Sequence, residues 1–125
     1  IGTFYANLFI IRVSNMPHIT IRGITPCIAE NISDSLFEQL SIICGNTKSS
    51  YTLELLASKQ FTGTTPFLKF VLVEIFWFPR EKPIQDAVEC AIRDILVTAD
   101  DSLNDIAVMF HALKRESYYR NGKHF

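Results

Sequence analysis

Residues 17 to 26 read PHITIRGITP, and this stretch decides the fold. Apolar and polar side chains alternate from Pro17 to Ile24, which is the period of a half-buried β-strand. Thr25 is a favourable helix N-cap. Pro26 suits the first helical position, because the N–H that proline lacks would have no hydrogen-bond partner within the helix there. The sequence therefore predicts a strand followed directly by a helix.

The predicted helix continues from Pro26 to Gly45. Apolar side chains recur along it every three or four residues, and the pair Gly45-Asn46 is a usual C-terminal stop. After a short loop, alternating residues from Tyr51 to about Phe61 predict a second strand. This first half of the chain therefore has the order strand, helix, strand.

The same order is repeated about fifty positions later. Residues 67 to 78 form a largely apolar run, as expected for a central strand covered on both faces. Pro83 can begin a second helix, whose apolar stripe extends from Ile84 to Leu96, and residues 106 to 113 predict a fourth strand. Asn121-Gly122 indicates a short C-terminal hairpin.

Two such βαβ halves predict an α+β domain of two layers. Right-handed crossovers give a four-stranded sheet with both helices on one face. Because the strands look apolar on both faces, we expect other subunits to cover the bare face, which makes the protein a homo-oligomer. We expect a single domain at residues 16 to 125, preceded at residues 1 to 15 by an extension from upstream sequence or from cloning.

Composition argues against several classes of partner. The chain has 12 basic and 13 acidic side chains and a net charge of -1, which favours neither nucleic acid nor a membrane surface as partner. No run approaches the roughly 20 apolar residues of a membrane span. Three cysteines, at 27, 44 and 90, lie far apart at positions of helix interior and lack metal-ligand spacing. We therefore expect a cytoplasmic protein without metal or cofactor.

The segment Met16 to Ile24 resembles the opening of tautomerase superfamily members, in which a proline follows the initiator methionine and begins the first strand. The sequence Gly45-Asn46-Thr47-Lys48 resembles the exit of the first helix in members of the macrophage migration inhibitory factor type. With residues 73 to 80 and 118 to 122, these motifs look most like an uncharacterised bacterial branch. The resemblance covers residues 16 to 125 and implies the tautomerase fold and a trimer, rather than the ferredoxin-like fold of the same element order.

The resemblance also implies a catalytic role for Pro17. In the family, the amine of an amino-terminal proline is kept neutral by a dry pocket with nearby cations, and it acts as a general base. Pro17 has such an amine only if Met16 is removed, because an amide nitrogen is not usefully basic. The alternative is that Pro17 merely begins a strand, where a missing N–H is tolerated.

An acid substrate also needs a cation for its carboxylate and an apolar wall beside the reacting carbon. Lys48 matches a pocket lysine of the family, and Arg80 and Arg115 are further candidate cations. Each of these is also consistent with an ordinary surface charge. Trp77 and Phe78 are candidate wall residues or core residues. His111 is a candidate acid or an interior hydrogen-bonded histidine; we rank His18 and His124 below it.

The expected function is therefore that of a tautomerase-like isomerase, which transfers a proton on a small keto or enol acid. The alternative is a catalytically inactive protein of the same fold that binds a small molecule or a partner. The aromatic and asparagine pair of the migration-inhibitory-factor branch is not matched, because Ala107 and Met109 occupy those positions. A third reading, an RNA-binding or regulatory ferredoxin-like module, fits poorly with the near-neutral charge.

Overall fold

A computed structural model describes residues 17–61, 63 and 70–124 of the chain. The expected extension at residues 1–15, and residues 67–69 of the expected central strand, lie outside this part. The main elements are β1 (His18–Arg22), α2 (Pro26–Cys44), β2 (Thr52–Leu55), β3 (Phe70–Trp77), α3 (Lys82–Ala99), β4 (Asp105–Ala112), β5 (Tyr119–Arg120) and β6 (Lys123–His124). Two short 3-10 turns are η1 (Lys48–Ser50) and η2 (Arg115–Ser117).

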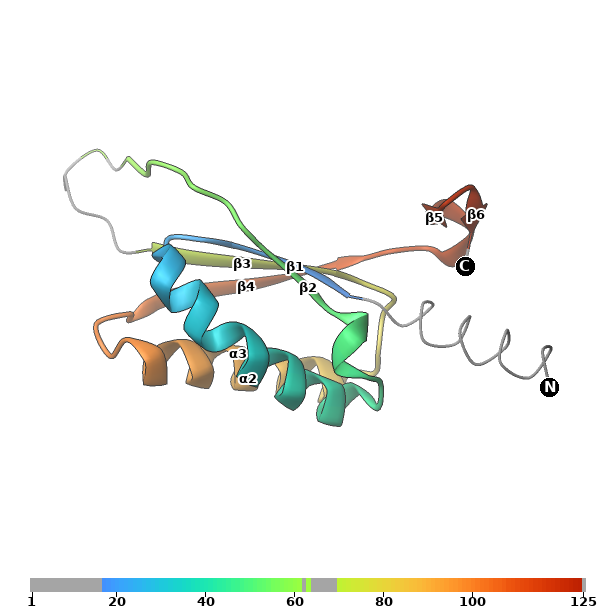
Figure 1. Cartoon of the computed structure of the whole chain (residues 1–125), viewed down its shortest axis with the longest axis horizontal. Helices are drawn as coiled ribbons and strands as arrows, with labels where there is room; N and C mark the ends of the chain where they lie inside the picture. The colour runs from blue at the N-terminus through green and yellow to red at the C-terminus, as the bar shows by residue number, and fades with distance from the viewer. Residues whose placement is uncertain (1–16, 62, 64–69, 125) are drawn as a thin grey trace.

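The large sheet has the strand order β2-β1-β3-β4. β1 pairs with β2, and β3 with β4, in parallel, whereas β1 and β3 are antiparallel. Both helices cover the same face of this sheet (Figure 1). The predicted fold class, two βαβ halves in two layers, is therefore confirmed, and β5 and β6 form the predicted C-terminal hairpin.

The ends of α2 follow the predicted capping chemistry. Thr25 Oγ1 accepts a hydrogen bond from the Ile28 N–H at 3.2 Å, and Pro26 is the first helical residue. At the other end Gly45 has a φ of 72°, and its N–H donates to the Ser41 carbonyl oxygen at 2.9 Å. These contacts satisfy backbone groups that a helix end leaves open.

The turn between β1 and α2 requires glycine. Gly23 has a φ of 97°, and a Cβ added there would lie 2.1 Å from the carbonyl oxygen of Phe70. No side chain fits at that distance, because two heavy atoms would overlap. Gly23 therefore lets the chain leave β1 in close contact with the backbone at the start of β3.

The core lies between the sheet and the helices. Alternate residues of β1 and β3 point into it, and α2 and α3 supply the facing side chains. Its most buried members include Ile19, Ile21, Leu36, Leu40, Val71, Val73, Ile75, Ile92 and Leu96. Among the described residues no helix has the length and apolar character needed to cross a lipid bilayer.

The sheet face that points away from the helices, here called the open face, is less apolar than expected. Pairing places Thr52, His18, Phe76 and His111 in one row across the four strands, and Glu54, Thr20, Glu74 and Met109 in the next. The alternation of β3 is intermediate, buried, intermediate, so only its helix-facing side is fully buried within one chain. Ionisable side chains thus interrupt the apolar residues of this face.

Two details differ from the sequence prediction. β2 ends at Leu55 instead of near Phe61, because its partner β1 has only five residues; the last backbone contact is from the Leu56 N–H to the Ile21 oxygen at 2.9 Å. Cys27 and Cys90 are exposed, and only Cys44 is buried. Cys27 and Cys90 therefore lie on the solvent side of their helices and are not small core residues.

Candidate functional site

Pro17 is buried immediately before β1. It lines a cavity of about 10 Å³ together with Cys44, Asn46, Trp77, Phe78 and Arg80. The end of α2 and the end of β3 thus meet at the beginning of β1. A cavity of this volume holds about one water molecule, so one chain alone encloses too little space for an acid substrate.

Arg80 brings a cation to this cavity. It follows Pro79, which prevents further pairing of β3, and its Nη1 donates to the carbonyl oxygen of Cys44 at 2.8 Å. The hydrogen bond fixes the guanidinium beside the end of α2. Because like charges repel, this cation would disfavour protonation of an amine at Pro17.

Two further residues that line the cavity make contacts with core side chains. Trp77 is buried, and its ring lies 4.8 Å from that of Phe110, measured between centroids. Asn46 Oδ1 accepts a hydrogen bond from the buried Tyr51 hydroxyl at 2.7 Å. Burial raises the pKa of this phenol above its usual value, so Tyr51 stays a neutral donor that orients Asn46.

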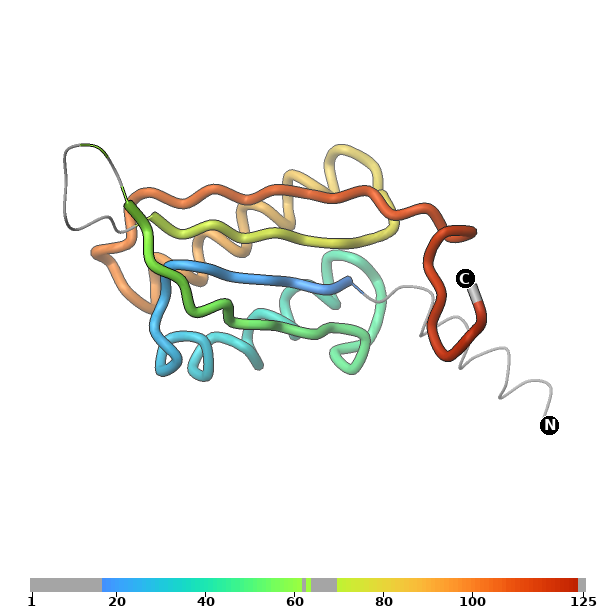
Figure 2. Tube along the Cα trace, turned by 90° about the horizontal axis from the view of Figure 1, so that it is seen from above, coloured from blue at the N-terminus to red at the C-terminus, as the bar shows by residue number. Residues whose placement is uncertain are grey.

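The C-terminal tail contacts Phe78. From the end of β4 it turns across the end of the sheet towards the beginning of β1 (Figure 2). The Cζ atom of Arg115 lies 4.6 Å from the ring centroid of Phe78, a cation–π distance. The ring of Tyr118 meets Phe78 edge-on at 5.7 Å between centroids. Phe78 therefore contacts both the cavity and the tail.

His18 of β1 forms a second contact with the tail. Its Nδ1 is hydrogen-bonded to Thr52 Oγ1 at 2.7 Å and its Nε2 to the Tyr118 hydroxyl at 2.5 Å. Burial, and secondly the charge of Arg120, lower the pKa of His18 below its ordinary value. The neutral imidazole, with one nitrogen donating and the other accepting, is therefore favoured.

The structure brings together four of the predicted site residues: Pro17, Trp77, Phe78 and Arg80 line the cavity. Arg115 adjoins them through Phe78. Lys48 lies apart, since its Nζ is paired with Asp34 Oδ1 of α2 at 2.6 Å on the surface. A contact between Lys48 and substrate stays a prediction.

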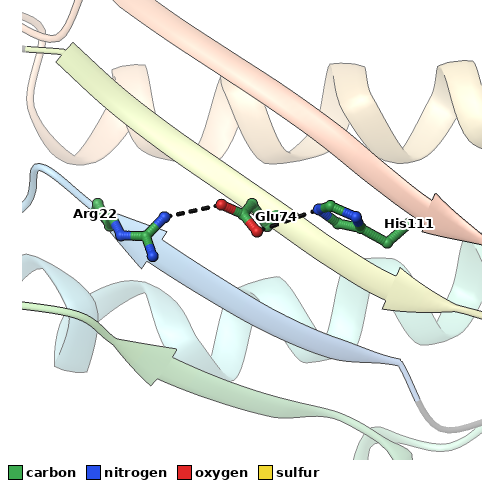
Figure 3. A network of polar contacts seen from close by, with 3 residues as sticks. All are labelled: Arg22, Glu74 and His111. Carbon is green, nitrogen blue, oxygen red and sulfur yellow. Dashed lines mark hydrogen bonds and ion pairs between the residues drawn. The ribbon is translucent and has the colours of Figure 1, made fainter.

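His111 also lies apart from the cavity, on the open face. Its ring stacks on Phe76 at 4.4 Å between centroids, and its Nε2 lies 3.2 Å from Glu74 Oε2. The other carboxylate oxygen of Glu74 accepts a hydrogen bond from Arg22 Nη1 at 2.8 Å (Figure 3). This network, Arg22–Glu74–His111, links β1, β3 and β4. A role of His111 as an acid stays a prediction.

Other parts of the described chain offer less for catalysis. A larger groove of about 340 Å³ lies between α2 and α3, but Asp94 is the one ionisable residue among those that line it. No cluster of three or more possible metal ligands occurs among the described residues. We therefore place the candidate site at Pro17.

Sequence reasoning ranked His18 below His111 and did not single out Tyr118. These two residues are separated by 100 positions, so no local spacing could reveal their contact. Cys44 and Tyr51 were also missed, because both read as ordinary core residues. Asn46 was visible only as part of the helix stop.

A family described as "Domain of unknown function (DUF1904)" matches residues 16–124. The chain belongs to the DUF1904 family. No match was found among the curated proteins. A protein of unknown function from Vibrio cholerae O1 biovar eltor is 29% identical to this DUF1904 chain, with 90% of each chain covered and a TM-score of 0.81.

Two further solved structures share the fold of this DUF1904 chain. A macrophage migration inhibitory factor-like protein from Entamoeba histolytica has 19% identity and a TM-score of 0.71, covering 88% of this chain and 99% of that one. A fused 4-OT protein, an asymmetric trimer, has 14% identity and a TM-score of 0.74, covering 86% and 94%. At these identities the match shows the fold, and it confirms the tautomerase-type architecture that the opening motif suggested.

Proposed function

We propose that this DUF1904 protein is an isomerase that moves a proton on a small keto or enol acid, with the amine of Pro17 as the base after removal of Met16. The observation that carries the proposal is the burial of Pro17 in a cavity that it shares with Arg80, Trp77 and Phe78. A base, a cation and an apolar wall are the parts that such a reaction needs.

The reaction follows from the chemistry of these groups. The neutral amine takes a proton from the carbon next to the substrate carbonyl, and the electron pair of that C–H bond moves towards the carbonyl oxygen. The protonated amine then returns the proton to a different atom of the resulting enolate. Arg80 attracts the substrate carboxylate and disfavours the charged amine, while Trp77 and Phe78 limit solvation of the site.

We further propose that the active protein is a homo-oligomer, most simply a trimer. The cavity within one chain is only about 10 Å³, so a neighbouring subunit must supply the rest of the substrate pocket. The half-exposed open face offers a surface for assembly. The fused 4-OT protein of the same fold is a trimer. Sedimentation should then give a stable oligomer; a monomer at micromolar concentration would contradict this part.

The test of catalysis begins with a chain translated from Met16. Intact mass should show loss of the methionine, and ¹⁵N-proline NMR should show a Pro17 amine that is neutral near pH 7. Proton exchange and isomerisation of small enol acids are then followed with wild type and Pro17→Ala. Arg93→Gln, which removes an exposed helix cation paired with Glu89, is the control.

Wild type and the Arg93 variant should be equally active, and Pro17→Ala should lose much of the activity, because its terminal amine is primary and lacks the ring that places the proline nitrogen. A chain that retains Met16 should be less active still, because its Pro17 nitrogen is an amide. Equal rates in Pro17→Ala and wild type would exclude the proline mechanism. Absence of activity with a free, neutral Pro17 amine would favour the binding-module alternative.

A further inference from the structure

The C-terminal tail, residues 113–124, is attached to the rest of the molecule near both of its ends. The Leu113 N–H donates to the Trp77 carbonyl oxygen at 2.8 Å and so extends the pairing of β3 with β4. Farther along, the Tyr118 hydroxyl is hydrogen-bonded to His18 of β1 at 2.5 Å. Arg115 lies between these two attachment points.

We propose that His18 and Tyr118 are positioning residues, whose hydrogen bond holds the tail against β1 and thereby keeps Arg115 beside the Pro17 cavity as a second cation for an acid substrate. The role of Arg115 towards substrate rests on the proposed function. The attachment of the tail does not, and it can be measured without any substrate.

The contacts of Phe78 with the cavity and with the tail support this assignment. Phe78 lines the cavity, carries the Arg115 guanidinium at 4.6 Å on its ring, and receives the edge of Tyr118 at 5.7 Å. The turn η2, closed by the Tyr118 N–H to the Arg115 oxygen at 3.3 Å, links the backbones of the two tail residues. Release of Tyr118 therefore removes one of the contacts that hold the turn, and with it the cation, against Phe78.

The imidazole of His18 is held from both sides in a way that defines its orientation. Thr52 Oγ1 binds Nδ1 from β2, and the Tyr118 hydroxyl binds Nε2 from the tail. A hydroxyl can donate or accept, so the neutral ring satisfies both partners with a single proton. The hydrogen bond thus joins the strand that follows Pro17 to a segment 100 positions away.

The attachment should weaken in acid. The charge of Arg120 on the tail acts on His18, Glu54 of β2 and Glu74 of β3 lie one step along the open face, and the Pro17 amine of the proposed function belongs to the preceding residue. Burial penalises an imidazolium, and the charge of Arg120 on the tail repels it as well; the repulsion by Arg120 is lost when the tail leaves. Protonation of His18 therefore favours the detached tail.

The test uses Tyr118→Phe, which removes only the hydroxyl and keeps the ring. Tyr119→Phe is the matched control, since it removes the same atom from a neighbouring side chain that is 65% exposed. Trypsin cleavage after Arg115 and Arg120 reports how often the tail is detached. Loss of one hydrogen bond should raise the cleavage rate about three- to tenfold in Tyr118→Phe, and leave the Tyr119 variant close to wild type.

A second measurement protects the test against an indirect effect. The NMR titration of the His18 ring should move upwards, towards the usual histidine pKa near 6.5, in Tyr118→Phe and not in the control. Unchanged cleavage together with an unchanged His18 titration would overturn the inference.

The link to substrate is tested in an active sample. Tyr118→Phe and Arg115→Gln should each raise KM more than they lower kcat, and the double variant should be no worse than Arg115→Gln alone. Additive effects would show that Tyr118 does not act through Arg115. If no substrate is turned over at all, the proposed function fails while the cleavage and titration results still decide the attachment.

Discussion

Arg80 Nη1 donates a hydrogen bond to the carbonyl oxygen of Cys44 at 2.8 Å. This contact joins the segment after β3 to the last turn of α2, and both partners line the cavity at Pro17. A helix C-terminus leaves carbonyl oxygens without intrahelical partners and carries a partial negative charge, which favours a cation there. One side chain thus closes the helix and places positive charge at the candidate base.

The first prediction concerns this arginine. Arg80→Gln should lower kcat/KM by about 10²-fold, because it removes the cation facing the substrate carboxylate and developing charge. The pKa of the Pro17 amine should rise in the same variant, which ¹⁵N NMR can measure. Arg80→Lys should retain part of both properties, since it keeps the charge but not the planar guanidinium. A Gln variant as active as wild type would remove Arg80 from the site.

The second prediction concerns Gly23. Gly23→Ala should destabilise the fold by more than 2 kcal/mol, roughly the cost of a left-handed alanine with an added steric overlap. Gly122→Ala is the control, because Gly122 has a φ of 81° and an added Cβ there meets nothing within 4 Å. That variant should lose only about 1 kcal/mol. Urea unfolding distinguishes the two; equal losses would mean that contact with the Phe70 oxygen contributes nothing.

The third prediction concerns the network Arg22–Glu74–His111. Its carboxylate side chain is only 18% exposed, whereas the two partners are 38% and 37% exposed. Glu74→Gln should cost about 1 kcal/mol in urea unfolding, as expected for partly exposed ion pairs, and less in high salt. Because the network lies on the open face, the same substitution should weaken self-association in sedimentation. Glu54→Gln, a single charge change on the same face, is the control.

The fourth prediction concerns pH. The pKa of His18 is lowered in the folded protein, so below about pH 6.5 the unfolded chain binds more protons than the folded one. The contribution of His18 to stability should therefore be fully present above that pH and decline as the pH falls towards the folded-state pKa. Urea unfolding of wild type and His18→Gln at several pH values should show a shrinking difference in acid. A difference that grows in acid would contradict it.

Most of the fold could be predicted from sequence because the decisive signals are local. Thr25, Pro26 and Gly45 mark the ends of α2 by their own hydrogen-bonding and backbone properties, and the structure reproduces each of them. The pairing of the two halves followed from the handedness of βαβ units. Neither the helix ends nor the strand pairing depends on knowing which residues far apart in the sequence are in contact.

The parts that could not be predicted depend on contacts between distant residues. The length of β2 is set by that of β1, and a single strand's sequence does not contain its partner's length. Lys48 was recognised by position, but its pairing with Asp34 of α2 is a property of the folded surface. The same holds for His18, whose importance appears only when Tyr118 lies beside it.

The beginning of β1 and the C-terminal hairpin lie at the same end of the sheet (Figure 2). The exposed loop at Asp101 precedes β4, whose first residue pairs with Phe70 at the opposite end of the sheet from the pairing of His18 with Phe76. A purification tag fused before Pro17 would turn the nitrogen of the candidate base into an amide. A tag fused behind the hairpin would lie next to the tail and could displace it. An affinity peptide inserted at Asp101 leaves both regions unaltered. With a tag at that position, a lack of activity in an assay reflects the natural protein and not the tag.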